Sequence, residues 1–208
     1  MIRFHYISDR ERCERAKILL QYAMILFFFL IAGILLFRTV SDDFIVSQAV
    51  IMLDRDETVF LHCQSLYEYI RCMLKYAMWD IASAFALFIC SFAVFNYVAS
   101  DLILAANAVK IGFSLAFLSL FISVGFAGIH ISLLRFIVFL TFRLLVVILL
   151  YSFAYACAIF SRKIRGADRN GRTRIRPRVI LPFLLNFAAS LCMILLCNFL
   201  YCIILACL

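Results

Sequence analysis

One arginine stands inside a segment that otherwise has the composition of a membrane-spanning helix. Arg143 lies within the apolar run 136–150. A charge at the centre of a bilayer costs about 2.5–3.5 kcal/mol on insertion scales, so an intramembrane arginine needs a partner or must reach an interface. Arg143 is therefore the residue of this chain whose chemistry most requires explanation.

Two acidic residues are candidates for that partner. Asp80 stands near the start of the predicted second span, and Asp101 follows its end. Only one of them can lie at the depth of Arg143. If the chain has five spans and a cytoplasmic amino end, Asp80 and Arg143 both lie in the outer half of the membrane, so Asp80 is the better match. The pair would either coordinate a polar passage or be structural, and Arg143 could alternatively extend to the outer head groups.

Residue types that perform catalysis or bind metals are not grouped in this sequence. His5, His62 and His130 are scattered over three segments and lack the spacing of metal ligands. The chain has no Gly-rich phosphate loop, no nucleophile elbow and no His-Glu pair of the metalloprotease type. We therefore predict no catalytic residue, no cofactor and no metal, and expect that the protein is not an enzyme.

Most of the nine cysteines lie in apolar segments, where a thiol acts as a small hydrophobic group. The last four recur every five residues, a spacing that does not form a stripe on a helix. Cys63 and Cys72 instead fall in the predicted external loop, where a disulfide could persist. Whether this pair is bridged or free stays open, because the spacing does not give its geometry.

The composition indicates an integral membrane protein. Of 208 residues, 67% are hydrophobic and 15% are charged, and the mean hydropathy is +1.07. Such a chain has too much apolar surface for a soluble domain of this size. Two prolines favour long helices, and the alternating ten-residue segments of membrane β-barrels are not found. We predict an all-α, polytopic helical bundle with about five transmembrane helices.

The five predicted spans belong to a single membrane domain, residues 1–208. In chain order, the predicted segments are a cytoplasmic amino-terminal helix at 1–17, span 1 at 18–37, an external loop with amphipathic helices at 38–75, span 2 at 76–98, a connector at 99–110, span 3 at 111–129, a lead-in and span 4 at 130–160, a basic loop at 161–178, and span 5 at 179–208. The long external loop is the one sizeable soluble region that this layout contains.

The charge distribution predicts the orientation. From Arg162 to Arg178 the chain carries eight basic residues against one acid, Asp168. The positive-inside rule keeps this loop and the amino end in the cytoplasm, with the acidic first loop outside. We expect a multi-pass cell-membrane protein with an external carboxyl end. The net charge of +8 is expected to meet anionic lipid head groups and not nucleic acid, because the cations flank apolar spans.

A short run at the start of the predicted third span is similar to a known family. Residues 110–117 read Lys-Ile-Gly-Phe-Ser-Leu-Ala-Phe, and Trp79 opens the preceding span. This pattern resembles the stage II sporulation protein M family, in which a basic residue and a Gly-Phe-Ser-Leu-Gly run follow a Trp-led second span. The five-span layout is also similar. The sequence differs at 80–82, where that family has a glycine, and at 128–130, where it has a Leu-Pro-His-like element.

The resemblance implies a non-enzymatic membrane scaffold in a spore-forming bacterium. Such a protein is needed for engulfment of the forespore and holds peptidoglycan-degrading proteins at the septal membrane. Its implied partners are peptidoglycan hydrolases and other membrane proteins, alongside membrane lipids. The implied motif residues are Trp79, Lys110, Gly112, Phe113 and Ser114.

The alternative hypothesis is a small transporter or channel component. It would use Arg143 and Asp80, with further polar residues at Asn96, Asp101 and Asn107. The two hypotheses differ in the role of Arg143. A transporter should lose substrate movement when Arg143 is replaced by leucine in a chain that still inserts, whereas a scaffold should keep its partners.

Overall fold

The computed structural model describes residues 9–40, 66–93, 96–123, 133–169 and 177–207, and these ranges are helical apart from short turns. The helices are α1 (Asp9–Phe37), α3 (Leu66–Cys90), α4 (Asn96–Ser123), α5 (Leu133–Arg169) and α6 (Pro177–Cys207). No strand occurs in the described ranges. The predicted all-α bundle is confirmed.

Within the described residues, four helices are long and apolar enough to cross a membrane on their own, in α1, α4, α5 and α6. The fifth candidate is α3, which bends by 57° between Tyr67–Lys75 and Ala77–Cys90. At 1.5 Å per residue the segment Ala77–Cys90 is about 20 Å long, shorter than a hydrocarbon core of about 30 Å. The protein is thus a multi-pass membrane protein, in which the bent α3 is either a broken fifth span or a re-entrant segment.

The connector predicted at 99–110 is wrong. These residues belong to α4, which begins at Asn96, and α3 ends at Cys90 instead of continuing to 98. The prediction relied on the polar residues Asp101, Asn107 and Lys110. Each of them has a polar partner on another helix, so these side chains are accommodated within the helical bundle.

The boundaries around the basic loop also differ from the prediction. A single helix, α5, runs for 37 residues from Leu133 to Arg169, so the predicted lead-in and fourth span are one element. This helix continues into the predicted loop, and α6 begins at Pro177. Proline suits the first position of a helix because the missing N–H would have no partner there. In the predicted external loop, residues 41–65 lie outside the described residues, and Leu66–Lys75 forms the start of α3.

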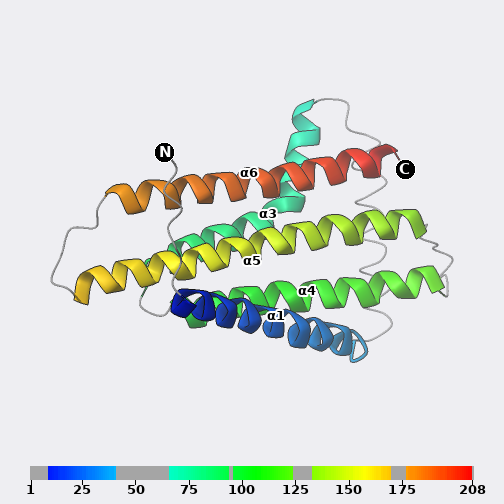
Figure 1. Cartoon of the computed structure of the whole chain (residues 1–208). Helices are drawn as coiled ribbons and strands as arrows, with labels where there is room; N and C mark the ends of the chain where they lie inside the picture. The colour runs from blue at the N-terminus through cyan, green and yellow to red at the C-terminus, as the bar shows by residue number, and fades with distance from the viewer. Residues whose placement is uncertain (1–8, 41–65, 94–95, 124–132, 170–176, 208) are drawn as a thin grey trace.

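The helices form one bundle, in which α1 lies along α4 and α5 lies beside α6 (Figure 1). Helix α3 contacts α4, α5 and α6. Its first turns project past α6 in Figure 1. We call the end where α1 begins, α5 ends and α6 begins the basic end, because the eight basic residues of 162–178 belong to this part of the chain.

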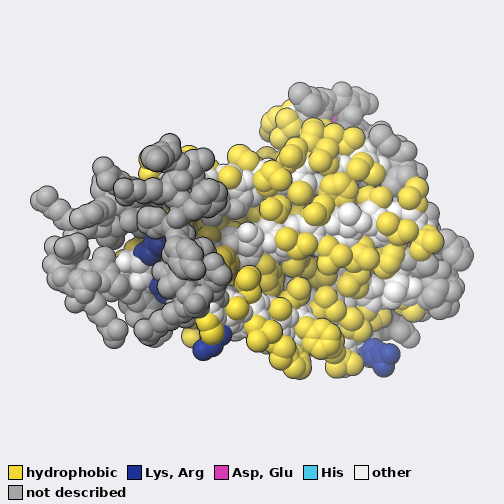
Figure 2. Space-filling view, viewed as in Figure 1, with side chains coloured by type: hydrophobic (Ala, Val, Ile, Leu, Met, Phe, Trp, Pro, Cys, Tyr) yellow, Lys and Arg dark blue, Asp and Glu magenta, His cyan; other side chains and the backbone are white. Residues whose placement is uncertain are grey.

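The outer surface of the bundle is apolar. Figure 2 shows hydrophobic side chains across the described face, with Lys and Arg near its ends. Large side chains such as Leu20, Phe27 and Leu185 are exposed by about 60% (65%, 61% and 62%). Exposure of so much apolar surface to water would be unfavourable, whereas contact with lipid chains is not.

Helices α1 and α4 approach each other through two glycines. A Cβ atom on Gly112 would collide with the carbonyl oxygen of Leu30, and one on Gly33 would collide with the carbonyl oxygen of Val109. The backbones of the two helices are therefore in direct contact. Small residues permit such close packing in membranes. We call this contact the glycine crossing.

Candidate functional site

A buried carboxylate on α3 contacts polar groups from three other helices. Asp80 of α3 is 3% exposed. Its Oδ2 lies 2.9 Å from Nη1 of Arg143 on α5 and accepts a longer hydrogen bond of 3.4 Å from Nδ2 of Asn198 on α6. Its Oδ1 lies 3.9 Å from Nζ of Lys110 on α4. We call Asp80, Lys110, Arg143 and Asn198 the charged centre.

The electrostatics of the charged centre explain why these residues converge. Two cations and one carboxylate leave a formal charge of +1, in a region of low dielectric constant where an unpaired charge is costly. The side chains of Asp80 and Arg143 are 4% and 12% exposed, so this pair is shielded from its surroundings. Lys110 is 39% exposed and more distant, and it contributes less. The Asp80–Arg143 pair is the dominant interaction.

A second set of hydrogen bonds flanks the charged centre. The indole Nε1 of Trp79 donates to Oδ1 of Asn107 at 3.1 Å, and Nδ2 of Asn107 donates to Oγ of Ser83 at 3.0 Å. The ammonium of Lys110 lies 5.5 Å from the centroid of the Trp79 ring, a cation–π arrangement. These contacts link α3 to α4 directly beside Asp80.

The space inside the charged centre is small. Asp80, Lys110 and Arg143 line a cavity of about 20 Å³, with Ser114, Phe139 and Leu150 in the wall. One water molecule needs roughly 10–15 Å³ measured in this way. The cavity therefore has room for about one water, and the polar groups mainly satisfy one another.

The family-like run divides between two faces of α4. Lys110 and Ser114, one helical turn apart, face the charged centre. Gly112 belongs to the glycine crossing, and the ring of Phe113 packs edge-on against Phe37 of α1 at 5.4 Å between centroids. Trp79 joins the first face from α3. All five motif residues thus take part in helix packing.

The structure places Arg143 beside the acid that the sequence favoured. The other candidate, Asp101, instead accepts a hydrogen bond at 2.8 Å from Nε2 of Gln21. Asn198 was missed by the sequence reasoning, although an asparagine within the apolar segment Ile180–Ile204 was a usable signal. Lys110 was noted for its motif position and not as a partner of Asp80.

A second polar group lies nearer the basic end, around Asp101 and two tyrosines. The rings of Tyr22 on α1 and Tyr151 on α5 meet edge-on with 6.1 Å between centroids. Within the described part of the chain, both hydroxyls and Oδ1 of Asp101 are buried without a hydrogen-bond partner. Such groups usually have a partner, often water.

The remaining candidate residues are more dispersed. Asn96 is buried at the start of α4, where its Nδ2 lies 3.4 Å from the carbonyl oxygen of Cys157. Among the described residues, no group of three His, Cys, Asp or Glu side chains could hold a metal. The three histidines, Cys63 and the side chain of Cys72 lie outside the described residues. The described residues therefore do not bear on whether Cys63 and Cys72 are bridged or free.

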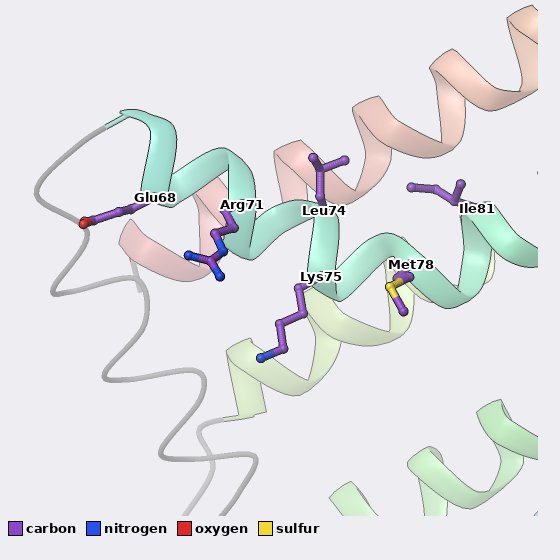
Figure 3. Close-up of a pocket in the computed structure, with 6 residues that line it drawn as sticks. All are labelled: Glu68, Arg71, Leu74, Lys75, Met78 and Ile81. Atoms are coloured by element: carbon purple, nitrogen blue, oxygen red, sulfur yellow. The ribbon is translucent and has the colours of Figure 1, made fainter.

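The bent part of α3 lines a groove at the end opposite the basic end. Glu68, Arg71, Leu74, Lys75, Met78 and Ile81 border a space of about 690 Å³. Arg71 and Lys75 extend to the same side of the helix in Figure 3, while Leu74 and Ile81 lie on the other side. The groove thus has a cationic edge beside apolar side chains.

Comparisons with protein-family models, with curated proteins and with solved structures find no match to this chain. The charged centre and the α3 groove are accordingly the features from which a function is argued.

Proposed function

We propose that this protein is a membrane scaffold that positions partner proteins. The observation that carries the proposal is the closure of the charged centre. Asp80 is satisfied by Arg143, Lys110 and Asn198, and the cavity lined by Asp80, Lys110 and Arg143 has room for about one water. Ligand sites usually have several hundred cubic ångströms. A closed centre favours a clamp that joins four helices over a site for a transported solute.

The orientation follows from the positive-inside rule. We place the basic end in the cytoplasm of a cell membrane, with the amino end cytoplasmic and the carboxyl end external. The α3 groove then faces the external side. Its exposed side chains, including Leu74 at 44% and Met78 at 67%, offer a surface on which an external partner can dock.

The family resemblance supports the choice of partner class. The roles of Lys110, Gly112, Phe113 and Ser114 in packing are those of a scaffold and require no reaction chemistry. By that resemblance, the partners are peptidoglycan-remodelling proteins that act during engulfment of a forespore. The protein itself is proposed to have no enzymatic activity.

A site-specific photo-crosslinking experiment tests the scaffold proposal in the native membrane. A photoreactive residue would replace Leu74 in the α3 groove, with the same residue at Leu185 on α6 as the lipid-facing control. We expect protein adducts that contain cell-wall hydrolases from position 74 and mainly lipid adducts from position 185. Lipid adducts alone at position 74, or the same proteins at both positions, would contradict docking in the groove.

The second candidate is a transporter component, which the group around Asp101 favours. Unpartnered buried oxygens of Asp101, Tyr22 and Tyr151 lie nearer the basic end than the charged centre, so polar groups occur at two depths. Flux of Na⁺, K⁺ and H⁺ into proteoliposomes discriminates the two candidates. A flux above that of empty vesicles that disappears in an Asp80→Asn/Arg143→Gln double variant would support transport. The scaffold proposal expects no such flux.

A further inference from the structure

A groove of about 290 Å³ lies between α5 and α6 near the basic end. Its lining includes Tyr155, Ile159 and Lys163 of α5 with Pro182, Phe183 and Asn186 of α6. Lys163 is the penultimate residue of the apolar span Phe136–Ile164, and Phe183 lies at the start of the span Ile180–Ile204. The groove therefore begins at the level where both spans leave the hydrocarbon.

The floor of the groove is aromatic. The rings of Phe160 and Phe183 stack with 3.8 Å between centroids and 5° between planes, and both residues are buried. Phe92 packs edge-on against both rings, at 5.4 and 6.1 Å between centroids. A smooth apolar floor between two helices suits an extended acyl chain, which fills it without needing a hydrogen bond.

Polar groups are present at the same groove. Lys163 and Asn186 line it and are exposed, so an ammonium and an amide are available to a ligand. The neighbouring Arg162 is directed elsewhere, because its Nε donates to the hydroxyl of Tyr97 on α4 at 2.6 Å. Among the described side chains, Lys163 is thus the cation that lines the groove.

The surrounding charge selects the sign of the ligand. The chain between α5 and α6, together with the adjoining helix ends, carries eight basic residues and one acid from Arg162 to Arg178. Each basic residue near a membrane surface attracts anionic lipid by about 1 kcal/mol, and basic pockets between transmembrane helices bind anionic head groups. We propose that this groove binds one anionic phospholipid, with its phosphate at Lys163 and an acyl chain over the Phe160–Phe183 stack. This inference does not depend on the proposed scaffold function.

Native mass spectrometry of the full chain tests the proposal. The protein would be reconstituted in nanodiscs of equal parts phosphatidylglycerol and phosphatidylcholine, released in the spectrometer, and examined for retained lipid. We expect one retained phosphatidylglycerol per chain. Lys163→Gln should lower its retention at least fivefold, because the phosphate loses its cation. The matched control is Lys17→Gln, which removes an exposed lysine from α1.

Several outcomes would overturn the proposal. Equal retention of the two lipids would show that charge does not select the ligand. Unchanged retention in Lys163→Gln, or an equal loss in Lys17→Gln, would remove the groove as the site. A lipid-free dimer would instead assign the groove to a second copy of the chain.

Discussion

The charged centre and the glycine crossing join helices by different physical means. The charged centre links α3, α4, α5 and α6 through Asp80 and its three partners. The glycine crossing links α1 to α4 because Gly33 and Gly112 lack side chains. Lipid is as apolar as leucine, so burial of apolar surface does not drive helices together in a membrane. The two regions show two other ways in which helices associate in a membrane, namely polar contacts and close backbone packing.

The largest effect is expected when the charged centre is broken at Arg143. Arg143→Leu leaves the buried carboxylate of Asp80 with a distant lysine and a long amide contact. Loss of one partner of a buried ion pair costs about 3–5 kcal/mol, and we expect a decrease of that order in the free energy of unfolding. Unfolding in detergent, followed by circular dichroism, measures it.

Two variants sharpen this prediction. Arg38→Leu removes an exposed arginine after α1 and should change stability little. Asp80→Asn combined with Arg143→Leu removes both charges and should recover most of the loss. A double variant as unstable as Arg143→Leu would show that the ion pair is not what Arg143 contributes.

An intermediate effect is expected at the glycine crossing. Gly112→Ile places a side chain against the backbone of α1 near Leu30, and the overpacking should cost about 1–3 kcal/mol. The same substitution at Ala106, an exposed position on the same helix, is the control. Detergent unfolding of both variants makes the comparison. Equal stability of the two would mean that the crossing tolerates a side chain.

The smallest effect is expected at Asn107, which flanks the charged centre without contributing charge. Asn107→Leu removes the hydrogen bonds to Trp79 and Ser83. Interhelical hydrogen bonds in membranes average about 0.6 kcal/mol, with a maximum near 1.7. Trp79 is the single tryptophan of the chain, so its emission reports the change directly. We expect emission at shorter wavelength, since the indole N–H loses its acceptor.

A matched asparagine separates this local effect from a general one. Asn186→Leu alters an exposed asparagine of α6, near the basic end and outside the charged centre. Its emission should equal that of the unaltered chain. An unchanged spectrum in Asn107→Leu would place Trp79 in a different environment from the one described.

Much of the fold was predictable because the bilayer restricts it strongly. The predicted first span, 18–37, nearly coincides with the apolar segment Ala16–Phe37 of α1. The proximity of Asp80 and Arg143 was also anticipated, since an intramembrane charge needs a partner and depth left few acids to choose from. The connector at 99–110 failed because polarity was taken as a sign of a loop. In this bundle the polar side chains of Asp101, Asn107 and Lys110 lie within a helix and contact polar groups on other helices.

Other features depend on contacts between distant segments. Gly33 and Gly112 are 79 positions apart (112 − 33), and their meeting depends on how α1 lies along α4. The bend of α3 has no proline to indicate it, since both prolines of the chain lie in α6. Asn198 contacts Asp80 only because α6 packs beside α3. Sequence patterns report each helix separately and cannot assign such pairings.

The sequence by itself determined that this chain is an all-α, multi-pass membrane protein, because length and apolar composition decide whether a segment is stable in lipid. It also determined that Arg143 must be compensated, since the cost of a charge in lipid does not depend on the fold. The tertiary structure alone decided which groups compensate it, how closely α1 approaches α4, and that the cavity at the charged centre has room for only about one water. These properties depend on the depth and rotation of each helix, which packing between helices sets.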